Sequence, residues 1–233
     1  MQDTLLLIPD KIDIERDALA NAWEKANGQV LRISKFWEKP NTQNKKLAIY
    51  GPDTFSLVLA QVVSIQLISP QDEWIAQIDK KWTKRFISIY KINSISSLSF
   101  PAFIKPITPK IFKAQTVESL PNLQKITSGL NASEQIIVSE IIAIQQEVRA
   151  FILNRKISDM AFYEGTGKIE EAHHFLTIFL ETSPLPLPKT FVIDIGYNAQ
   201  LGWFLLEFNA TWGAGLNGCN PDKVIACIAE ASF

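Results

Sequence analysis

Apolar and polar positions alternate between strand and helix patterns over the first 80 residues. Short apolar runs predict strands, and apolar positions three or four residues apart predict helices. We expect strands at Thr4–Pro9, Gln29–Ser34, Lys46–Tyr50 and Ile65–Ser69, and helices at Asp13–Ala26, Thr54–Val63 and from Pro70 toward Ile78. This rhythm predicts a small open sheet with helices on its faces. The segment has neither a GxGxxG nor a GxxxxGK motif, so the pattern alone indicates no nucleotide site.

The rest of the chain is richer in strand patterns. We expect strands at Ala102–Lys105, Ile111–Val117, Gln135–Ile144, Glu147–Leu153, Lys156–Phe162, Phe191–Gly196 and Trp203–Asn209, and a closing helix at Pro221–Ala229. The segment His174–Leu180 fits a helix or a strand. On a strand, His173 and His174 would point to opposite faces and would form a poor chelate.

Composition narrows the class of protein. The chain has 233 residues, is 47% hydrophobic and 20% charged, and carries a formal net charge of −1. The chain is therefore large and apolar enough to bury a core. Its near-zero net charge argues against broad binding to nucleic acid or to anionic membranes. The longest apolar stretch, Phe55–Ile68, is broken by polar residues, and we expect a cytoplasmic protein. Cys219 and Cys227 fit buried thiols of a reduced compartment.

The last two strands gather polar side chains on one face. Folding them as a hairpin around Gln200-Leu201 sets Ile193 opposite Phe208 and Ile195 opposite Leu206, which makes one face apolar. The other face then carries Asp194, Glu207 and Asn209.

Two opposed carboxylates destabilise a sheet unless something compensates them. A divalent cation with oxygen ligands does so, and Mg²⁺ is usually bound by one or two carboxylates plus substrate phosphates. The pattern leaves other interpretations open: a solvated acidic pair at a sheet rim, or a pair neutralised by nearby lysines.

The C-terminal motifs resemble the end of an ATP-grasp domain. They read Asp194-Ile-Gly and Leu205-Leu-Glu207-Phe-Asn209-Ala-Thr-Trp-Gly-Ala-Gly215, and the second is similar to the clade named for two arginines and one lysine. The resemblance covers roughly residues 80–230. It implies an α+β / α/β fold with a small N-terminal open α/β lobe (1–80), followed by two α+β lobes (81–138 and 139–233) that clamp ATP. It also implies that Asp194, Glu207 and Asn209 hold Mg²⁺.

Further site residues rest on the same resemblance. Lys105, in Phe103-Ile-Lys105-Pro106, resembles a phosphate-binding lysine, and Lys110 resembles a second lysine on a hairpin that covers ATP. Plain strand-end lysines are the alternative for both.

Three more strand or pre-strand segments carry candidates. Glu140 and Ile142 resemble the segment that receives adenine, although a plain strand fits them too. Glu147 and Arg149 resemble a Glu-x-Arg strand, in which Arg149 would stabilise the transferring group and Glu147 would hold ribose or orient Arg149. A surface ion pair is the alternative. Arg85 falls where the clade carries an arginine.

The resemblance implies a ligase that joins a carboxylate to an amine through an acylphosphate, with ATP and a small-molecule or peptide substrate as partners. The alternatives are an ATP-dependent phosphotransferase using the same site and a non-catalytic ATP-binding protein. A homodimer is left open. No serine, histidine and aspartate pattern of a hydrolase competes with this interpretation.

Overall fold

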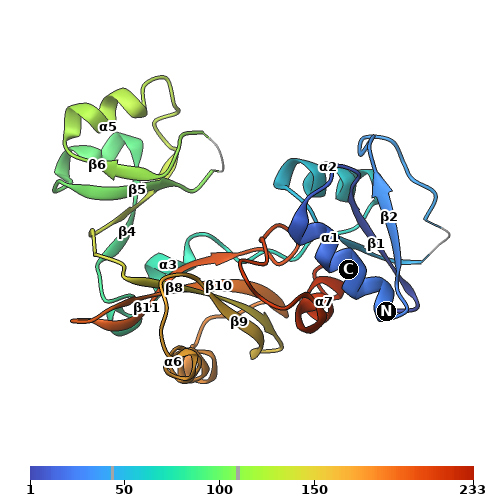
Figure 1. Cartoon of the computed structure of the whole chain (residues 1–233). Coiled ribbons are helices and arrows are strands. Elements are labelled where there is room, and N and C mark those ends of the chain that lie inside the picture. Colours follow the sequence, from blue (N-terminus) through green and yellow to red (C-terminus); the bar gives the residue numbers. More distant parts are fainter. Residues whose placement is uncertain (43–44, 109–110) are drawn as a thin grey trace.

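The computed structural model describes residues 1–42, 45–108 and 111–233. Within these ranges the chain forms three sheets, each with helices packed on it (Figure 1). The helices are α1 (Ile14–Lys25), α2 (Asp53–Val63), α3 (Trp74–Gln77), α4 (Lys80–Thr83), α5 (Leu120–Ile126), α6 (Ile169–Thr182) and α7 (Pro221–Ala229), with a 3-10 helix at Ile92–Ser97.

The first sheet is parallel and small, with the strand order β2 (Gln29–Ile33), β1 (Thr4–Pro9), β3 (Lys46–Ile49). Alternate side chains of β1 enter different cores: Leu6 packs with α1 and α7, and Leu7 packs with α2. The expected fourth strand at Ile65–Ser69 is wrong. Among the described residues that segment makes a single bridge, from Leu67 to Ser232, and its backbone hydrogen-bonds to Ala231 and Phe233 instead of joining the parallel sheet.

Helix α1 begins and ends as its sequence predicts. The Asp13 side chain caps it by accepting a hydrogen bond from the Arg16 N–H at 3.0 Å. After its C-cap, Ala26, the chain turns at Asn27, whose φ of 61° is left-handed, and at Gly28, where an added Cβ would lie 2.2 Å from the Trp23 ring.

The second sheet is antiparallel, with the order β4 (Ile87–Lys91), β7 (Gln135–Ser139), β5 (Ala102–Pro106), β6 (Gln115–Val117). Helix α5 packs on it and forms the separate lobe at the upper left of Figure 1. The strand predicted at Gln135–Ile144 is too long, because Ser139 is the last residue that β4 and β5 can pair with. The prediction for Ile111–Val117 is too long as well, since β6 begins at Gln115.

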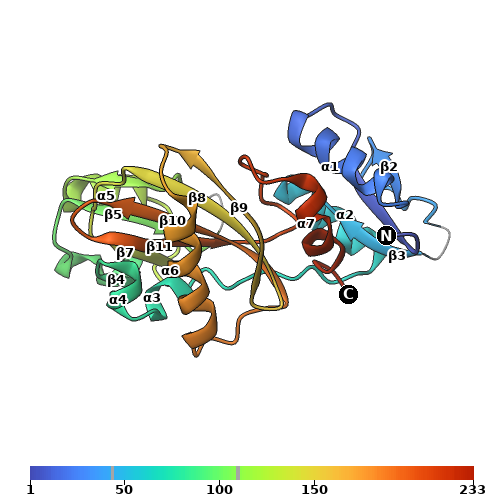
Figure 2. The ribbon, with the colours of Figure 1, turned by 60° about the horizontal axis from the view of Figure 1, so that its bottom comes forward.

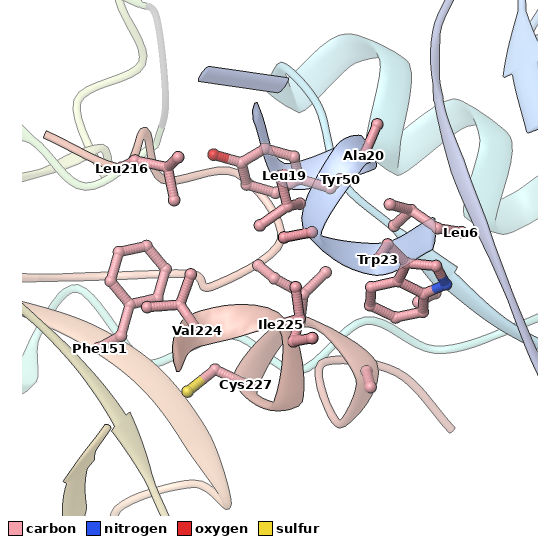
Figure 3. Packing of buried hydrophobic residues seen from close by; sticks show 14 of the residues in the cluster. Leu6, Leu19, Ala20, Trp23, Tyr50, Phe151, Leu216, Val224, Ile225 and Cys227 are labelled. Atoms are coloured by element: carbon pink, nitrogen blue, oxygen red, sulfur yellow. The ribbon is translucent and has the colours of Figure 1, made fainter. Parts of the chain in front are cut away.

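The third sheet is antiparallel, with the order β11 (Gly202–Asn209), β10 (Thr190–Asn198), β8 (Gln146–Leu153), β9 (Lys156–Glu164). Helix α6 covers one face, as Figure 2 shows, so the ambiguous segment is a helix and the two histidines do not lie on a strand. Helix α7 packs between this sheet and α1. In Figure 3, Val224 lies beside Phe151 and Ile225 lies toward Leu19.

The β10–β11 hairpin confirms most of the predicted register and corrects one part of it. Val192 pairs with Asn209, Ile193 with Phe208 and Asp194 with Glu207. Ile195 pairs with Leu205, not Leu206, because a β-bulge shifts the register after Asp194. Leu205 is therefore fully buried in the core, and Leu206 faces the site.

None of the helices in the described ranges is long and apolar enough to cross a bilayer.

Candidate functional site

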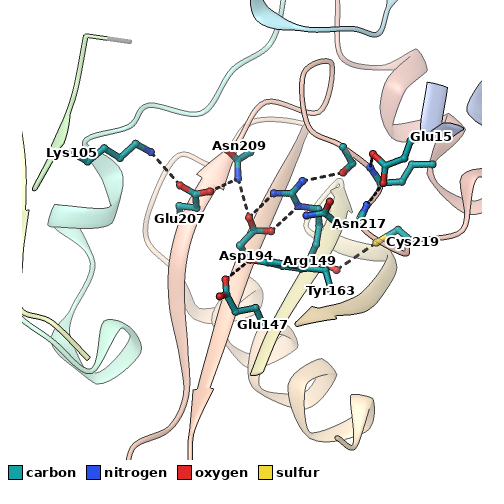
Figure 4. A network of polar contacts seen from close by, with 12 residues as sticks. Glu15, Lys105, Glu147, Arg149, Tyr163, Asp194, Glu207, Asn209, Asn217 and Cys219 are labelled. Carbon is teal, nitrogen blue, oxygen red and sulfur yellow. Dashed lines mark hydrogen bonds and ion pairs between the residues drawn. The ribbon is translucent and has the colours of Figure 1, made fainter. Parts of the chain in front are cut away.

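Arg149 and Asp194 form the centre of the site. The register places them opposite each other on β8 and β10. The Arg149 Nε donates to Asp194 Oδ1 at 2.8 Å, and a terminal guanidinium nitrogen donates to Oδ2 at 2.6 Å (Figure 4). Only 2% of the Asp194 side chain is exposed. A two-pronged pair of this kind gives a buried carboxylate both charge compensation and a fixed orientation.

Asn209 and Lys105 extend the centre to Glu207. The Asn209 Nδ2 lies 3.2 Å from Asp194 Oδ2 and 3.1 Å from Glu207 Oε1 and donates to both. On the far side, Lys105 Nζ lies 3.2 Å from Glu207 Oε2 and 3.5 Å from Asp72 Oδ1. The structure thus brings together the predicted metal set and Lys105, and it adds Asp72, which the sequence interpretation missed.

Burial and charge set the proton affinities of these groups. Burial raises the pKa of Asp194 above its ordinary value, and the ion pair with Arg149 limits the rise. Burial also pushes the pKa of Glu207 upward, but Lys105 and the Asn209 amide outweigh it, so this pKa lies below its ordinary value. For Lys105, the charges of Glu207 and Asp72 outweigh burial and raise the pKa. Glu207 and Lys105 are therefore both ionised at neutral pH.

The donor set fits Mg²⁺ in chemistry, although cations of the chain already neutralise the two acids. Glu207 is 42% exposed on its side chain and offers oxygens that an ion can reach, and Asn209 can turn its amide oxygen toward the same point. Both oxygens of Asp194 are hydrogen-bonded. Across the described residues, no three side chains of His, Cys, Asp or Glu converge as a metal cluster, so phosphate oxygens would have to complete the coordination.

A cavity of 310 Å³ opens beside this centre, between the second and third sheets. Its walls include the apolar side chains of Phe103, Ile141, Ile142 and Ile144 together with the carboxylates of Asp194 and Glu207. Apolar walls with a few placed polar groups are typical of small-molecule sites. Glu140 also lines the cavity, but its carboxylate accepts a hydrogen bond from the Phe86 N–H at 2.8 Å.

Tyr163 is a cavity residue for which the sequence pattern indicated no role. Its hydroxyl donates to Glu147 Oε2, and both side chains line the cavity. Its ring centroid lies 5.8 Å from the Arg149 guanidinium carbon. Tyr163 therefore orients Glu147 and covers Arg149. Of the remaining predicted residues, Lys110 lies outside the described residues.

Arg85 is buried against the β11 bulge. Its guanidinium donates to the carbonyls of Leu205 at 2.8 Å and Leu206 at 3.3 Å, and to Ser139 Oγ at 3.0 Å. A bulge leaves some backbone groups without a hydrogen-bond partner on the neighbouring strand. Arg85 provides donors for two such carbonyls, those of Leu205 and Leu206. Burial lowers its pKa to about 10, so it stays a cation at neutral pH. These contacts are structural, and a catalytic role for Arg85 stays a prediction.

Replacing Arg85 with methionine should lower the free energy of unfolding by about 2–4 kcal/mol, because several buried acceptors lose their donor. Arg85→Lys should recover part of the loss. Urea denaturation measures it, and Lys91→Met, at an exposed position, is the matched control with a change within about 0.5 kcal/mol. Equal stability of Arg85→Met and wild type would contradict the bulge assignment.

The glycine-rich loop 213–218 lies against the N-terminal lobe. The carboxylate of Glu15 accepts hydrogen bonds from the backbone N–H groups of Leu216 at 2.9 Å and Asn217 at 2.8 Å. The Gly215 carbonyl accepts a hydrogen bond from Arg149 at 3.0 Å. Neighbouring backbone N–H groups of a loop can bind an anion, and here the anionic group is the Glu15 carboxylate. Nothing in the local sequence pattern pointed to Glu15.

Comparisons with known proteins identify the family and the fold. The model of an ATP-grasp domain, family 2 of the clade named for two arginines and one lysine, matches residues 82–227. No curated protein matches the chain. Among solved structures, it resembles a RimK domain protein ATP-grasp from Sphaerobacter thermophilus, with 13% identity, a TM-score of 0.61, and coverage of 97% of this chain and 99% of that chain.

Two further structures share the fold. The D-cycloserine synthetase DcsG has 14% identity and a TM-score of 0.61, over 97% of this chain and 99% of that chain. The D-alanine–D-alanine ligase from Bacillus anthracis, complexed with ATP, has 13% identity and a TM-score of 0.51, over 98% of this chain and 96% of that chain. The family match covers more than half of the sequence, and the chain belongs to the ATP-grasp family, in the clade named for two arginines and one lysine.

Proposed function

We propose that this chain is an ATP- and Mg²⁺-dependent ligase that joins a carboxylate to an amine through an acylphosphate, with substrates of the amino acid or peptide type. The cavity between the two antiparallel sheets carries the proposal, because it combines apolar walls with charged side chains. Proteins with the same fold are named as ligases and synthetases, which supports this reaction class.

The apolar walls of the cavity suit the adenine ring. Phe103, Ile141, Ile142 and Ile144 provide contact area for a flat base. Glu140 lines the same cavity, and its carboxylate accepts a hydrogen bond from the Phe86 N–H. In the proposal, backbone groups after Ser139, where the strand pairing stops, contact the edge of the base.

The charged side chains of the site suit the phosphates. Lys105, and in the proposal Lys110, provide point charges for phosphate oxygens. Mg²⁺ would be held by Glu207, Asn209 and Asp194, and it would offset phosphate charge during transfer. Arg149 would then stabilise the transferring group from the opposite side. No covalent attack by a protein side chain is required, because positioning of the substrates and neutralisation of charge would accelerate the phosphoryl transfer.

Calorimetry with Mg-ATP tests the proposal. We expect the wild type to bind, and we expect Glu207→Gln to bind about 10–100-fold more weakly, because one charged oxygen ligand is lost. Glu181→Gln, at an exposed position of α6 outside the cavity lining, is the control that keeps the same charge change.

Two results would overturn the assignment in different ways. Failure of the wild type to bind Mg-ATP would sink the proposed function. Equal affinity of Glu207→Gln and wild type would remove Glu207 from the metal set. If the protein consumed ATP when the only other substrate was a hydroxyl compound, with no amine present, the phosphotransferase would be favoured over the ligase.

A further inference from the structure

Glu15 of the N-terminal lobe holds a loop that is distant in sequence but lies beside the site. Its two carboxylate oxygens each accept one backbone N–H, from Leu216 at 2.9 Å and Asn217 at 2.8 Å (Figure 4). These bonds join positions 201 and 202 residues apart in the chain. Hydrogen bonds from N–H groups to a charged acceptor are stronger than those between neutral groups. Glu15 therefore ties the first lobe to the third.

Steric fit shows that the carboxylate and the loop are matched to each other. A Cβ added at Gly215 would lie 2.6 Å from Glu15 Oε2, so a larger residue there would displace the carboxylate from its present position. Two neighbouring contacts hold the same loop: the Tyr50 hydroxyl donates to the Ala214 carbonyl at 2.9 Å, and the Gly51 N–H donates to the Trp212 carbonyl at 3.0 Å.

The loop in turn contacts the centre of the site. The Gly215 carbonyl accepts a hydrogen bond at 3.0 Å from Arg149, and the other described hydrogen bonds of that guanidinium go to Asp194. A planar guanidinium that is held at both ends keeps a single orientation. The position of Gly215 thereby bears on where the Asp194 oxygens lie.

We propose that Glu15 is a positioning residue of the metal side of the site: its carboxylate fixes loop 215–217, and the Gly215 carbonyl then orients Arg149 on Asp194. The inference rests on the proposed function for its metal readout. Glu15 acts through the loop, and in Figure 4 it lies on the opposite side of Arg149 from Lys105. Its loss should therefore weaken the contribution of Mg²⁺ to ATP affinity and leave metal-free nucleotide affinity unchanged.

The test measures ATP affinity with Mg²⁺ and with EDTA for wild type and Glu15→Gln. The ratio of the two affinities should fall about tenfold in Glu15→Gln, since its amide keeps only one of the two acceptor contacts and loses the charge. Glu15→Asp, which keeps the charge on a shorter side chain, should recover part of the ratio. Asp17→Asn, which removes a surface ion pair with Arg32 on the same helix, is the control and should keep the wild-type ratio.

A double-mutant cycle separates positioning from a general loss of stability. If Glu15 acts through Arg149, Glu15→Gln should add little to the effect of Arg149→Lys on the ratio, whereas independent effects would multiply. Amide hydrogen exchange of residues 213–217 should rise in Glu15→Gln whether or not nucleotide binds. An unchanged ratio, a multiplicative cycle or unchanged exchange would overturn the inference. Absence of Mg-ATP binding by the wild type would overturn the proposed function, and the exchange experiment alone would then decide whether Glu15 holds the loop.

Discussion

Arg149→Met is expected to destabilise the protein by about 3–5 kcal/mol, the usual cost of removing one partner of a buried ion pair. Asp194 is 2% exposed and pairs with Arg149 through both oxygens. Methionine fills a similar volume but leaves that carboxylate buried without a counter-charge. Urea denaturation at neutral pH measures the loss. Arg32→Met, which removes an exposed ion pair with Asp17 away from the cavity, is the control for loss of an arginine.

The same variant should respond to pH in a defined direction. Burial and the charges of Glu207 and Glu147 raise the pKa of Asp194, and Arg149 is the group that lowers it. Without Arg149 the folded-state pKa rises further above the unfolded value, so the native state holds the extra proton. Stability of Arg149→Met should therefore increase as pH falls from neutral, and the deficit relative to wild type should shrink. A deficit that is constant with pH would show that Asp194 is not the group left unpaired.

Asp194→Asn combined with Arg149→Met gives the matching control. The double variant lacks the carboxylate that Arg149→Met leaves unpaired, so it should be more stable than Arg149→Met alone at neutral pH. If the stability lost by the double variant relative to wild type equalled the sum of the losses of the two single variants, the pair would not be coupled.

The fold follows from the sequence where local signals agree. Thr4–Pro9 and Pro221–Ala229 were predicted with their observed bounds, because prolines and apolar runs mark their ends. The turn at Asn154-Arg155 has left-handed φ values of 50° and 59°, which asparagine tolerates and which a two-residue hairpin needs. The Asp194–Glu207 pair was predicted because the hairpin register is short-range.

Bulges explain what the sequence could not predict. Counting residues back from the turn at Asn154-Arg155 pairs Arg149 with Met160, but a bulge shifts its partner to Ala161. That shift puts Tyr163 on the face of Arg149, where counting would place it on the opposite face. Likewise, the β11 bulge exchanged the faces of Leu205 and Leu206. Glu15 and Asp72 were missed for a different reason, since only the packing of separate lobes brings them to the site.

Lys105→Met is expected to lower affinity for Mg-ATP by about 100-fold, the scale of one or two charged hydrogen bonds lost in a partly buried site. Lys105 lies between Glu207 and Asp72, and it is the cation that neutralises both in the structure. Without it, the two carboxylates would repel the phosphates that Lys105 attracts. Calorimetry measures the change, and Lys125→Met, at an exposed position of α5 in the same lobe, should bind like the wild type.

The effect of Lys105 on the pKa of Glu207 should be measurable as a change in the pH dependence of ATP affinity. Burial raises the pKa of Glu207, and the charge of Lys105 is the strongest of the influences that nevertheless keep this pKa below its ordinary value. In Lys105→Met that pKa should rise, and protons should then compete with Mg²⁺ for Glu207 as pH falls. The Mg²⁺-dependent part of ATP affinity should decline at a higher pH in the variant than in the wild type. Identical pH profiles would mean that Lys105 contacts phosphate without tuning the metal ligand, and a wild-type affinity in Lys105→Met would remove it from the phosphate site.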